Sequence, residues 1–370
     1  MSSTAPYAIA DILCRRFRIR LDEVLVDAMH GDHSHFDLVT VVVTRADGLQ
    51  GTGYTYCGGR GAGAIEAVIR DDFAPLLTGR DARDVEALNA AMYWRLHYVG
   101  RGGIVSFAIS ALDIALWDLR GKASGQPLWR MAGGRGRSAQ IYRGAIDLHY
   151  APERMAQAAR GYVAEGYEAV KIKIGRADMR EDLARARATR DIIGADRAFM
   201  IDANYGYDVA RAIEAARAFA EFGYVFFEEP TLPDHYDDYT RIFAATGAPL
   251  AQGENLHTQE EFDEALARSS LAFLQPDASN CGGVTGWLAA ARAAEAKGVI
   301  ACSHGMQELH VSLVAGAAPT GWVEAHSFPI DRYATTPLLR EHGRAIAPDV
   351  PGTGVDFDWA KLSDAHDPPR

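Results

Sequence analysis

Charged side chains recur at nearly regular intervals along the second half of this 370-residue chain, each at or near the end of a short apolar run. A β-strand that is buried on both faces is normally almost continuously apolar. The need for solubility therefore does not explain why seven successive runs end in a charged or titratable group. These groups are Lys171 and Lys173, Asp202, Glu228 and Glu229, Glu254, Asp277, His304 and Glu324. Their types predict one shared site for metal binding and proton transfer.

Three of these carboxylates predict a magnesium site. The interval from Asp202 to Glu228 equals the interval from Glu228 to Glu254, and each interval spans one strand and one helix. Carboxylates that converge from three neighbouring strands repel one another unless a cation holds them, and a ligand set made only of oxygen favours Mg²⁺. Three acids that are hydrogen-bonded separately in loops are the alternative. Glu229 faces away from Glu228, and the spacing does not decide which of the two is the ligand.

Two lysines in the run Val170-Lys171-Ile172-Lys173-Ile174 share one face, because side chains alternate along a strand. The aliphatic residues suit the face towards the helices, which directs both ammonium groups into the barrel. Burial and mutual repulsion disfavour the charged forms, so we expect lowered lysine pKa values and a base at Lys173. A buried ion network with nearby carboxylates is the alternative, and Lys171 is also open to a role in binding and tuning only.

A histidine and an aspartate predict a second acid/base group, because His304 follows Asp277 by one further strand-helix unit. An aspartate on the neighbouring strand can hold one imidazole nitrogen and raise the basicity of the other. We expect this dyad on the side of the ring opposite the lysines; a purely structural histidine is the alternative. Glu324, on the last strand, is expected to protonate an oxygen or to bind a hydroxyl group.

The elements that must position these residues alternate between strand and helix. Eight β-branched or aromatic runs between residues 140 and 327 are separated by helical runs rich in Ala, Arg and Glu. This order predicts an α/β fold with a closed parallel barrel of the TIM type, in which active sites lie at the C-terminal ends of the strands.

The sequence before this alternation has a different pattern. LVTVVVTR and GTGYTY flank Asp47-Gly48 and predict a hairpin. The helical spacing of SFAISALDIALWDLRGK predicts a helix that closes at Gly121. A stretch rich in Gly and Arg follows and marks a boundary. The predicted organisation is a first domain over residues 1–130, a barrel over 131–330 and a segment over 331–370 that returns to the first domain.

The composition argues against several classes of partner. The formal net charge is −11 and no basic patch stands out, which argues against nucleic acid and anionic membranes. No apolar stretch approaches the roughly 18 residues of a membrane span, and the first residues lack an apolar signal core. The four cysteines lack the spacing of disulfide or metal motifs, which is typical of a cytoplasmic protein.

The chain resembles the enolase superfamily, in its mandelate racemase subgroup. The resemblance extends over essentially the whole chain, including ALWDLRGKASGQPLW and PDVPGTGV. It rests on seven motifs in a characteristic order and spacing: Lys171-Ile172-Lys173, Asp202-Ala203-Asn204, Glu228-Glu229-Pro230, Gly253-Glu254-Asn255, Gln275-Pro276-Asp277, Ser303-His304-Gly305 and Trp322-Val323-Glu324.

The resemblance implies a modified (β/α) barrel beneath an N-terminal α+β capping domain that the C-terminal segment completes. It implies Mg²⁺ as cofactor, a small carboxylate substrate held between two acid/base groups, and a homo-oligomer, often an octamer. The site residues implied are Asp202, Glu228 and Glu254 as metal ligands, Lys173, His304 and Asp277 as acid/base groups, and Lys171, Asn204 and Glu324 as groups that bind the substrate or its enediolate.

Two bases on opposite faces of a substrate permit either racemisation or dehydration. Residues 29–37 carry three histidines and two aspartates and are expected to cover the substrate, with His33 as a binding residue. Such a polar lining suits a polyhydroxylated substrate. We therefore predict dehydration of an acid sugar, an aldonate or aldarate, to a 2-keto-3-deoxy acid. A racemase or epimerase of a 2-hydroxy acid and a protein that binds an acid anion without turnover are the alternatives.

A zinc site at His30, His33 and His35 is a further reading of the same segment. We favour it less, because the carboxylates at the strand ends already account for a metal.

Overall fold

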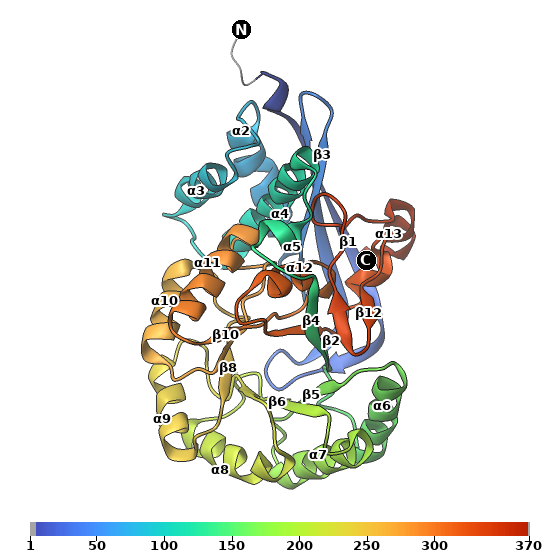
Figure 1. Ribbon diagram of the computed structural model, residues 1–370, viewed down its shortest axis with the longest axis vertical. Helices are drawn as coiled ribbons and strands as arrows, with labels where there is room; N and C mark the ends of the chain where they lie inside the picture. The colour runs from blue at the N-terminus through green and yellow to red at the C-terminus, as the bar shows by residue number, and fades with distance from the viewer. Residues whose placement is uncertain (1–4, 369–370) are drawn as a thin grey trace.

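The computed structural model describes residues 5–368 and shows two units in contact (Figure 1). The smaller unit comes from the first third of the chain and lies at the top of the view. In the lower unit, helices surround a set of short strands. The fold is α/β, a modified TIM-type barrel with an N-terminal α+β capping domain, which confirms the predicted class.

The capping domain is an antiparallel sheet against which α4 packs. Its strands are β1 (Ile9–Val26), β2 (Asp32–Arg45) and β3 (Gln50–Cys57), and the predicted hairpin joins β2 to β3. Its helices are α1 (Ala62–Val68), α2 (Ala74–Leu77), α3 (Val85–Leu96), α4 (Ile104–Ser124) and α5 (Leu128–Met131). A Cβ atom on Gly53 would lie 2.0 Å from the carbonyl oxygen of Ala111, so glycine is required for this close approach of β3 to α4.

Helix α4 continues past Gly121, so the predicted end was wrong. The helix ends at Ser124, and Gly125 follows it in the left-handed conformation with φ 67°. Gly121 instead permits a close contact, because a Cβ atom there would lie 2.6 Å from the Cα atom of Gly352. A helical pattern does not reveal a contact between residues so distant in the sequence.

All eight predicted barrel strands are present. They are β4 (Ser138–Gly144), β5 (Ala169–Lys173), β6 (Ala198–Asp202), β7 (Phe227–Glu228), β8 (Leu250–Gln252), β9 (Phe273–Leu274), β10 (Ile300–Ala301) and β11 (Trp322–Ala325). The helices between them are α6 (Pro152–Ala164), α7 (Met179–Ile193), α8 (Val209–Phe219), α9 (Tyr236–Thr246), α10 (Gln259–Arg268), α11 (Gly283–Ala296) and α12 (Gln307–Gly316).

The barrel strands are parallel and nearly closed into a ring. The ladder runs from β4 in sequence order to β10, and β11 pairs with β4 from the other side. Just after β10, the backbone N–H of Ser303 donates to the carbonyl oxygen of Trp322 at 3.0 Å, which brings the two ends of the ladder together. Every C-terminal strand end therefore opens towards one face.

Strand β5 has the predicted alternation. Val170, Ile172 and Ile174 pack in an apolar cluster with residues of α6 and α7. Lys171 and Lys173 are buried on the opposite face, inside the barrel. A strand of this pattern is stable only if the barrel interior supplies partners for two ammonium groups.

The C-terminal segment contacts both units. It contains β12 (Leu339–Glu341), β13 (Arg344–Ile346) and α13 (Trp359–Ala365). Strand β13 pairs antiparallel with β4 of the barrel, whereas α13 packs against β1 of the cap. The backbone N–H of Arg18 donates to Nδ1 of His366 at 3.0 Å. Short 3-10 segments at Ala5–Tyr7, Ala220–Phe222 and Ile330–Tyr333 and a π-helical turn at Ile69–Phe73 complete the elements.

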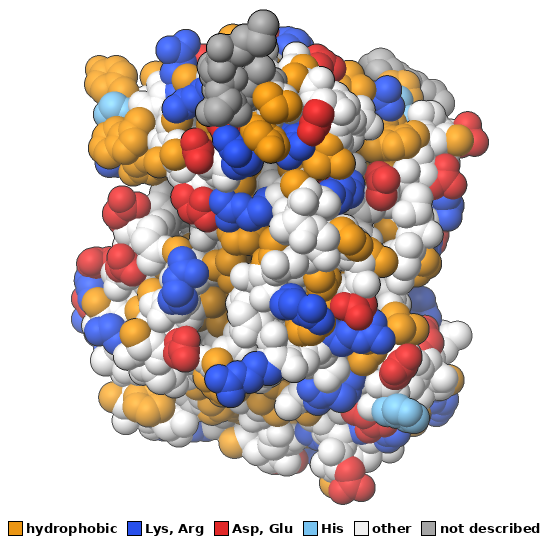
Figure 2. All heavy atoms as spheres, turned by 45° about the horizontal axis from the view of Figure 1, so that its top comes forward, with side chains coloured by type: hydrophobic (Ala, Val, Ile, Leu, Met, Phe, Trp, Pro, Cys, Tyr) orange, Lys and Arg blue, Asp and Glu red, His pale blue; other side chains and the backbone are white. Residues whose placement is uncertain are grey.

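The face shown in Figure 2 mixes charges of both signs. Blue and red side chains alternate over it and do not gather into a basic patch. Apolar side chains gather at the upper left, where α3 lies in Figure 1. At the end of α3 and in the loop after it, Trp94, Tyr98 and Val99 are 64%, 94% and 74% exposed.

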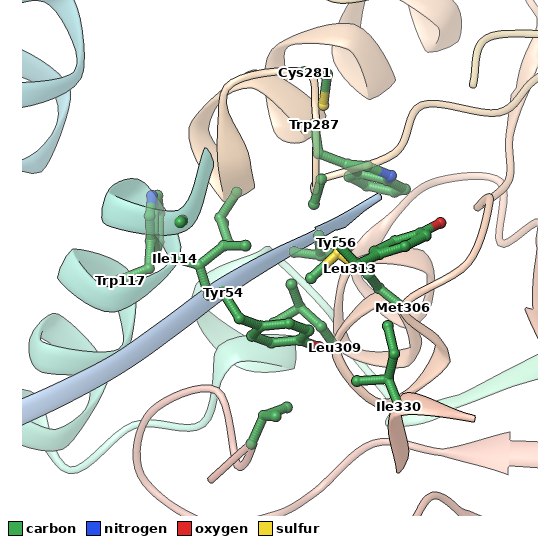
Figure 3. Packing of buried hydrophobic residues seen from close by; sticks show 14 of the residues in the cluster. Tyr54, Tyr56, Ile114, Trp117, Cys281, Trp287, Met306, Leu309, Leu313 and Ile330 are labelled. Atoms are coloured by element: carbon green, nitrogen blue, oxygen red, sulfur yellow. The ribbon is translucent and has the colours of Figure 1, made fainter. Parts of the chain in front are cut away.

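The cap and the barrel share one apolar core. Figure 3 shows Tyr54 and Tyr56 of β3 among Met306, Leu309 and Leu313 of the barrel. All five are buried in a cluster that also contains residues of α4 and α11. This shared core fixes the cap over the strand ends. Among the described residues, no helix combines the length and apolar character needed to cross a bilayer.

Candidate active site

A cavity of about 430 Å³ lies where the strand ends meet the cap. The predicted site residues that line it are Lys173, Asn204, Glu254, Asp277 and His304 from the barrel and His33 from the cap. The other predicted site residues, Lys171, Asp202, Glu228 and Glu324, are almost fully buried next to the cavity and do not line it. The strand ends thus bring together two layers of polar groups, one on the wall and one behind it.

The three predicted metal ligands converge. Asp202 ends β6, Glu228 ends β7 and Glu254 follows β8, and one oxygen of each lies within 4.8 Å of the others. Glu229, by contrast, accepts two hydrogen bonds from the Asn255 amide at 2.9 Å each. Of the two adjacent glutamates, Glu228 is therefore the one that joins the convergent group, and its role as a ligand stays a prediction.

This donor set fits Mg²⁺. Burial and the neighbouring Asp202 raise the pKa of Glu228 well above its usual range, although Lys171 opposes the shift. Oε2 of Glu254 is shielded from solvent, yet no described residue donates a hydrogen bond to it. Hard carboxylate oxygens with a free coordination position on a cavity wall are what Mg²⁺ binds. Asp202, Glu228 and Glu254 are therefore the residues that would hold it.

The lysines form the ion network that was the alternative interpretation. Lys171 Nζ lies 2.8 Å from Glu228 Oε1 and 2.9 Å from Glu324 Oε1. Lys173 Nζ lies 2.5 Å from Asp202 Oδ2, and Lys173 alone of the two lysines lines the cavity.

The prediction of lowered lysine pKa values was wrong. Burial does favour the neutral amines, but the carboxylates outweigh it and raise the pKa of both. Glu228 and Glu324 act most on Lys171, and Asp202 acts most on Lys173. The argument from strand alternation omitted these carboxylates, because it treated one strand in isolation.

His304 and Asp277 form the predicted dyad. Nδ1 of His304 lies 2.9 Å from Asp277 Oδ2, and its Nε2 lies 3.4 Å from Glu254 Oε2. Burial opposes the imidazolium, but Glu254 and Asp277 raise the pKa of His304 to about 10. Lys173 contacts Asp202 and His304 contacts Glu254, so the two predicted acid/base groups lie at opposite ends of the row of three carboxylates.

A tyrosine from the cap completes this dyad. The hydroxyl of Tyr56 on β3 donates to Asp277 Oδ2 at 2.8 Å and lies 3.3 Å from His304 Nδ1. Gly305 leaves room for it, because a Cβ atom there would lie 2.2 Å from the tyrosine hydroxyl. The sequence did not reveal Tyr56, since nothing in the hairpin shows how the cap docks on the barrel.

Two further predicted residues complete the wall and its support. Asn204 has a left-handed backbone with φ 39°, its N–H donates to Asp202 Oδ1, and its own Oδ1 is buried without a hydrogen-bond donor among the described residues. That oxygen is free to accept from a substrate. Glu324 Oε2 accepts from the backbone N–H of Gly305 at 3.0 Å, which fixes the loop that carries His304.

The cap loop contributes a hydrogen-bonded cluster to the cavity wall. Asp27 Oδ2 lies 3.0 Å from both His30 Nδ1 and His33 Nε2, and Asp27 Oδ1 accepts from the backbone N–H groups of Met29 and His30. These bonds orient both imidazoles towards the cavity that they line.

The three-histidine zinc site is not formed. His35 points elsewhere, with Nε2 3.1 Å from Oδ2 of Asp367. The ladder between β1 and β2 is irregular here, since His35 pairs with Arg20 whereas His33 pairs with Leu25. Asp27 takes the place of the third histidine, and one ligand atom each of Asp27, His30 and His33 lies within 4.8 Å of the others.

Two more wall residues were missed. His326 follows Glu324 by two positions, and Arg60 lies in the glycine-rich segment after β3; both line the cavity. The period of two along β11 was the signal for His326, because it places residues 324 and 326 on one face. Arg60 carries no comparable signal.

Comparison with known proteins agrees with this geometry. Residues 20–133 match the family model of the mandelate racemase / muconate lactonizing enzyme N-terminal domain, and residues 154–361 match that of the enolase C-terminal domain-like family. A 3,6-anhydro-alpha-L-galactonate cycloisomerase from Streptomyces coelicolor is 40% identical over 94% of this chain and 96% of its own. An L-talarate/galactarate dehydratase from Salmonella typhimurium is 30% identical over 88% of this chain and 83% of its own.

A solved structure supports the same assignment. The crystal structure of a racemase from Streptomyces coelicolor with bound magnesium has a TM-score of 0.94 and 39% identity, and covers 97% of this chain and 100% of its own. The chain is an enzyme that uses Mg²⁺, and it belongs to the mandelate racemase/muconate lactonizing enzyme subgroup of the enolase superfamily.

Proposed function

We propose that this enzyme removes the proton on carbon 2 of an acid sugar and eliminates the oxygen on carbon 3, which gives a 2-keto-3-deoxy acid. The observation that carries this proposal is the pair of acid/base groups at the two ends of one metal-ligand set. Lys173 contacts Asp202, and the His304–Asp277 dyad contacts Glu254. A cavity wall that carries two proton-transfer groups beside a set of metal ligands suits removal of a proton next to the carboxylate of a substrate.

The difficult step is removal of a weakly acidic proton, because it leaves an enediolate with two negative charges. Mg²⁺ held by Asp202, Glu228 and Glu254 would supply positive charge that stabilises this enediolate and would weaken the attraction between the Asp202 carboxylate and the Lys173 ammonium group. Lys171 and Glu324 do not line the cavity, so we assign them a supporting role through the carboxylate and the loop that they contact.

The protein groups then move two protons. Neutral Lys173 Nζ accepts the proton from carbon 2, the C2–C3 double bond forms, and the bond from carbon 3 to its oxygen breaks. His304 Nε2 donates a proton to the departing oxygen while Asp277 holds Nδ1. The resulting enol becomes the 2-keto acid when carbon 3 is protonated.

Dehydration and cycloisomerisation share this step. If the oxygen on carbon 3 is a hydroxyl group, water leaves; if it is a ring ether, the oxygen stays attached through another carbon and the product is an isomer. The 40% identical cycloisomerase and the 30% identical dehydratase carry names that correspond to these two outcomes. We therefore keep dehydration of an aldonate or aldarate as the proposed reaction and cycloisomerisation of an anhydro acid as the second.

Several polar side chains on the cavity wall, which Met29, Phe107, Ile146 and Phe328 also line, favour elimination over racemisation of a simple 2-hydroxy acid. The cap contributes His30, His33, Asp32 and Arg60 to it. A substrate with several hydroxyl groups can form hydrogen bonds with such side chains, whereas an aryl substrate offers them none. We assign His33 and Asn204 to substrate binding on this basis.

The test is a screen of aldonates, aldarates and anhydro acids with Mg²⁺, with NMR detection of the 2-keto product in deuterated water. We expect product from at least one acid and incorporation of deuterium. Deuterium at carbon 2 with inversion and no keto product would instead identify a racemase or epimerase. A Lys173→Ala enzyme that retained full function would identify a protein that acts by binding alone.

A further inference from the structure

We propose that His326 forms a hydrogen-bond subsite beside His304 that takes the uncharged oxygen on carbon 3 of the substrate. This inference rests on the proposed function and adds a binding group for the oxygen that leaves. It separates two tasks, since one histidine holds the oxygen and the other supplies the proton.

His326 is in the right place for this task. It follows the last residue of β11, lines the cavity and is 7% exposed. Its ring centroid lies 5.1 Å from that of His304, with 63° between the ring planes. One substrate oxygen can therefore lie within reach of both imidazoles.

The ring is held in one orientation. The ring of Phe328 packs against it edge-on at 4.8 Å between centroids, and the ring of Tyr56 lies at 6.2 Å. The backbone N–H of His326 donates to Oε1 of Gln307 at 3.3 Å. These contacts come from the cap, from α12 and from the loop after β11, so the ring does not need substrate to order it.

One hydrogen bond fixes the position of the imidazole proton. The backbone N–H of Phe328 donates to Nδ1 of His326 at 3.2 Å, so Nδ1 must present a lone pair. The proton of a neutral ring is then on Nε2. Burial, together with the neighbouring His304 and the two lysines, lowers the pKa of His326 well below its ordinary range although Glu324 opposes the shift, so the ring stays neutral.

The consequence is a donor that cannot act as an acid/base group. Among the described residues, none accepts a hydrogen bond from Nε2 of His326. An N–H group on a cavity wall binds an oxygen with a lone pair, whether a hydroxyl or an ether. A substrate without oxygen on carbon 3 would leave this donor unpaired.

A matched pair of variants tests the assignment. Gln places its amide nitrogen near the position of histidine Nε2, whereas Asn reaches only the position of Nδ1. His326→Gln therefore keeps the donor into the cavity, and His326→Asn keeps the contact with Phe328 but loses that donor. Both are compared in a Lys173→Ala background with Mg²⁺, where turnover does not interfere.

The measurement is the affinity for galactonate and for 3-deoxygalactonate by calorimetry. We expect the parent to bind galactonate about tenfold more tightly, His326→Gln to keep most of that preference, and His326→Asn to lose it. Equal affinity of the parent for the two acids, or an unchanged preference in His326→Asn, would overturn the subsite. Failure of the parent to bind either acid, together with a screen of acids that gives no product, would refute the proposed function as well.

A second measurement determines the imidazole tautomer in the parent protein, and the His326→Gln variant serves only to assign the signals. In ¹⁵N-histidine-labelled protein, the signals lost in His326→Gln identify His326. We expect a bare Nδ1 and a protonated Nε2 whose shift responds to galactonate and not to 3-deoxygalactonate. A proton on Nδ1, or the same response to both acids, would contradict the proposal.

Discussion

Lys173 and His304 are the two residues that transfer protons in the proposed reaction: Lys173 accepts one from the substrate and His304 donates one. Lys173 contacts Asp202 at one end of the metal-ligand set, and His304 contacts Glu254 at the other. Lys173 acts on the bond from carbon 2 to hydrogen, and His304 acts on the bond from carbon 3 to oxygen. Substitution of His304 should therefore leave proton exchange by Lys173 intact.

His304→Asn tests this division. Asn can still donate to Asp277, but it lacks a group at the position of Nε2. We expect product formation to fall by at least about 100-fold, while Lys173 still exchanges the proton on carbon 2 with solvent. NMR in deuterated water measures both, and Lys173→Ala is the control that should lose both. Full product formation by His304→Asn would show that the dyad is misassigned.

Tyr56 is a positioning residue whose effect should appear in kcat. Its hydroxyl donates to Asp277, and Phe in its place leaves the ring in the core but removes that bond. We expect Tyr56→Phe to lower kcat about 10- to 100-fold with little change in KM. Tyr54→Phe, on the same strand but bonded to Glu308, is the control and should keep kcat. Equal losses in both variants would indicate general damage to cap docking.

At the residue scale, the sequence predicted which side chains converge but not their electrostatics. The equal spacing of Asp202, Glu228 and Glu254 places them at the same height on consecutive strands, and a pattern carries that information. The pKa of Lys173 depends on the distance of Asp202 from its ammonium, and no spacing gives that distance. His326 was missed because only Glu324 was considered on β11, and the next residue on the same face, just beyond the end of the strand, was not.

At the scale of elements, β3 and α12 join the cap to the barrel through a buried acid. The hydroxyl of Tyr54 donates to Glu308 at the start of α12, and the other carboxyl oxygen of Glu308 has no donor among the described residues. Burial raises the pKa of Glu308 to about 8. The folded enzyme therefore keeps this proton in a pH range in which the unfolded chain releases it.

This acid predicts a dependence of stability on pH. The contribution of Glu308 to the free energy of unfolding should fall as pH rises from the ordinary glutamate pKa of about 4.5 to about 8. The expected slope is on the order of 1 kcal/mol per pH unit. Glu308→Gln has no such proton, so its Tm relative to the parent should increase between pH 5 and pH 8. Exposed Glu153→Gln should show no such trend. A constant difference in Tm would mean that Glu308 is ionised in the folded enzyme.

Strand order was predictable at this scale because each barrel unit repeats the same local pattern. All eight strands lie where the apolar runs occur, from β4 to β11. The end of α4 was not predictable, because Gly121 packs against Gly352 and the helix ends at Gly125 instead. The position of Tyr56 in the site was not predictable for the same reason. Docking of the cap on the barrel depends on contacts that no local sequence pattern contains.

For the whole molecule, acidic residues outnumber basic ones, and carboxylates also outnumber lysines in the site. The net charge is −11, and Lys171 and Lys173 face four carboxylates, those of Asp202, Glu228, Glu254 and Glu324. A protein with this balance does not attract an acid substrate by its own charge. We therefore expect Mg²⁺ to contribute to substrate binding as well as to the proposed reaction.

The homo-oligomer stays a prediction, and the surface suggests where to test it. Trp94, Tyr98 and Val99 form an exposed apolar group on the cap, and such groups often mark contacts between proteins. We expect light scattering to show an oligomer and Val99→Asp with Tyr98→Ser to reduce its mass. Leu339→Ser, at a separate exposed apolar residue, should leave the mass unchanged. A monomeric parent, or a double variant of unchanged mass, would exclude this surface.

The activity that we propose for this site is removal of a proton next to a carboxylate with the help of Mg²⁺. The most direct measurement follows the proton on carbon 2 of the best acid sugar by NMR in deuterated water, with Mg²⁺, after chelation and after Mg²⁺ is restored. With Mg²⁺ present, we expect loss of that signal and formation of a 2-keto-3-deoxy acid. After chelation, and in Lys173→Ala, we expect neither loss of the signal nor formation of the product. Product formed at an undiminished rate in chelated enzyme or in Lys173→Ala would contradict it.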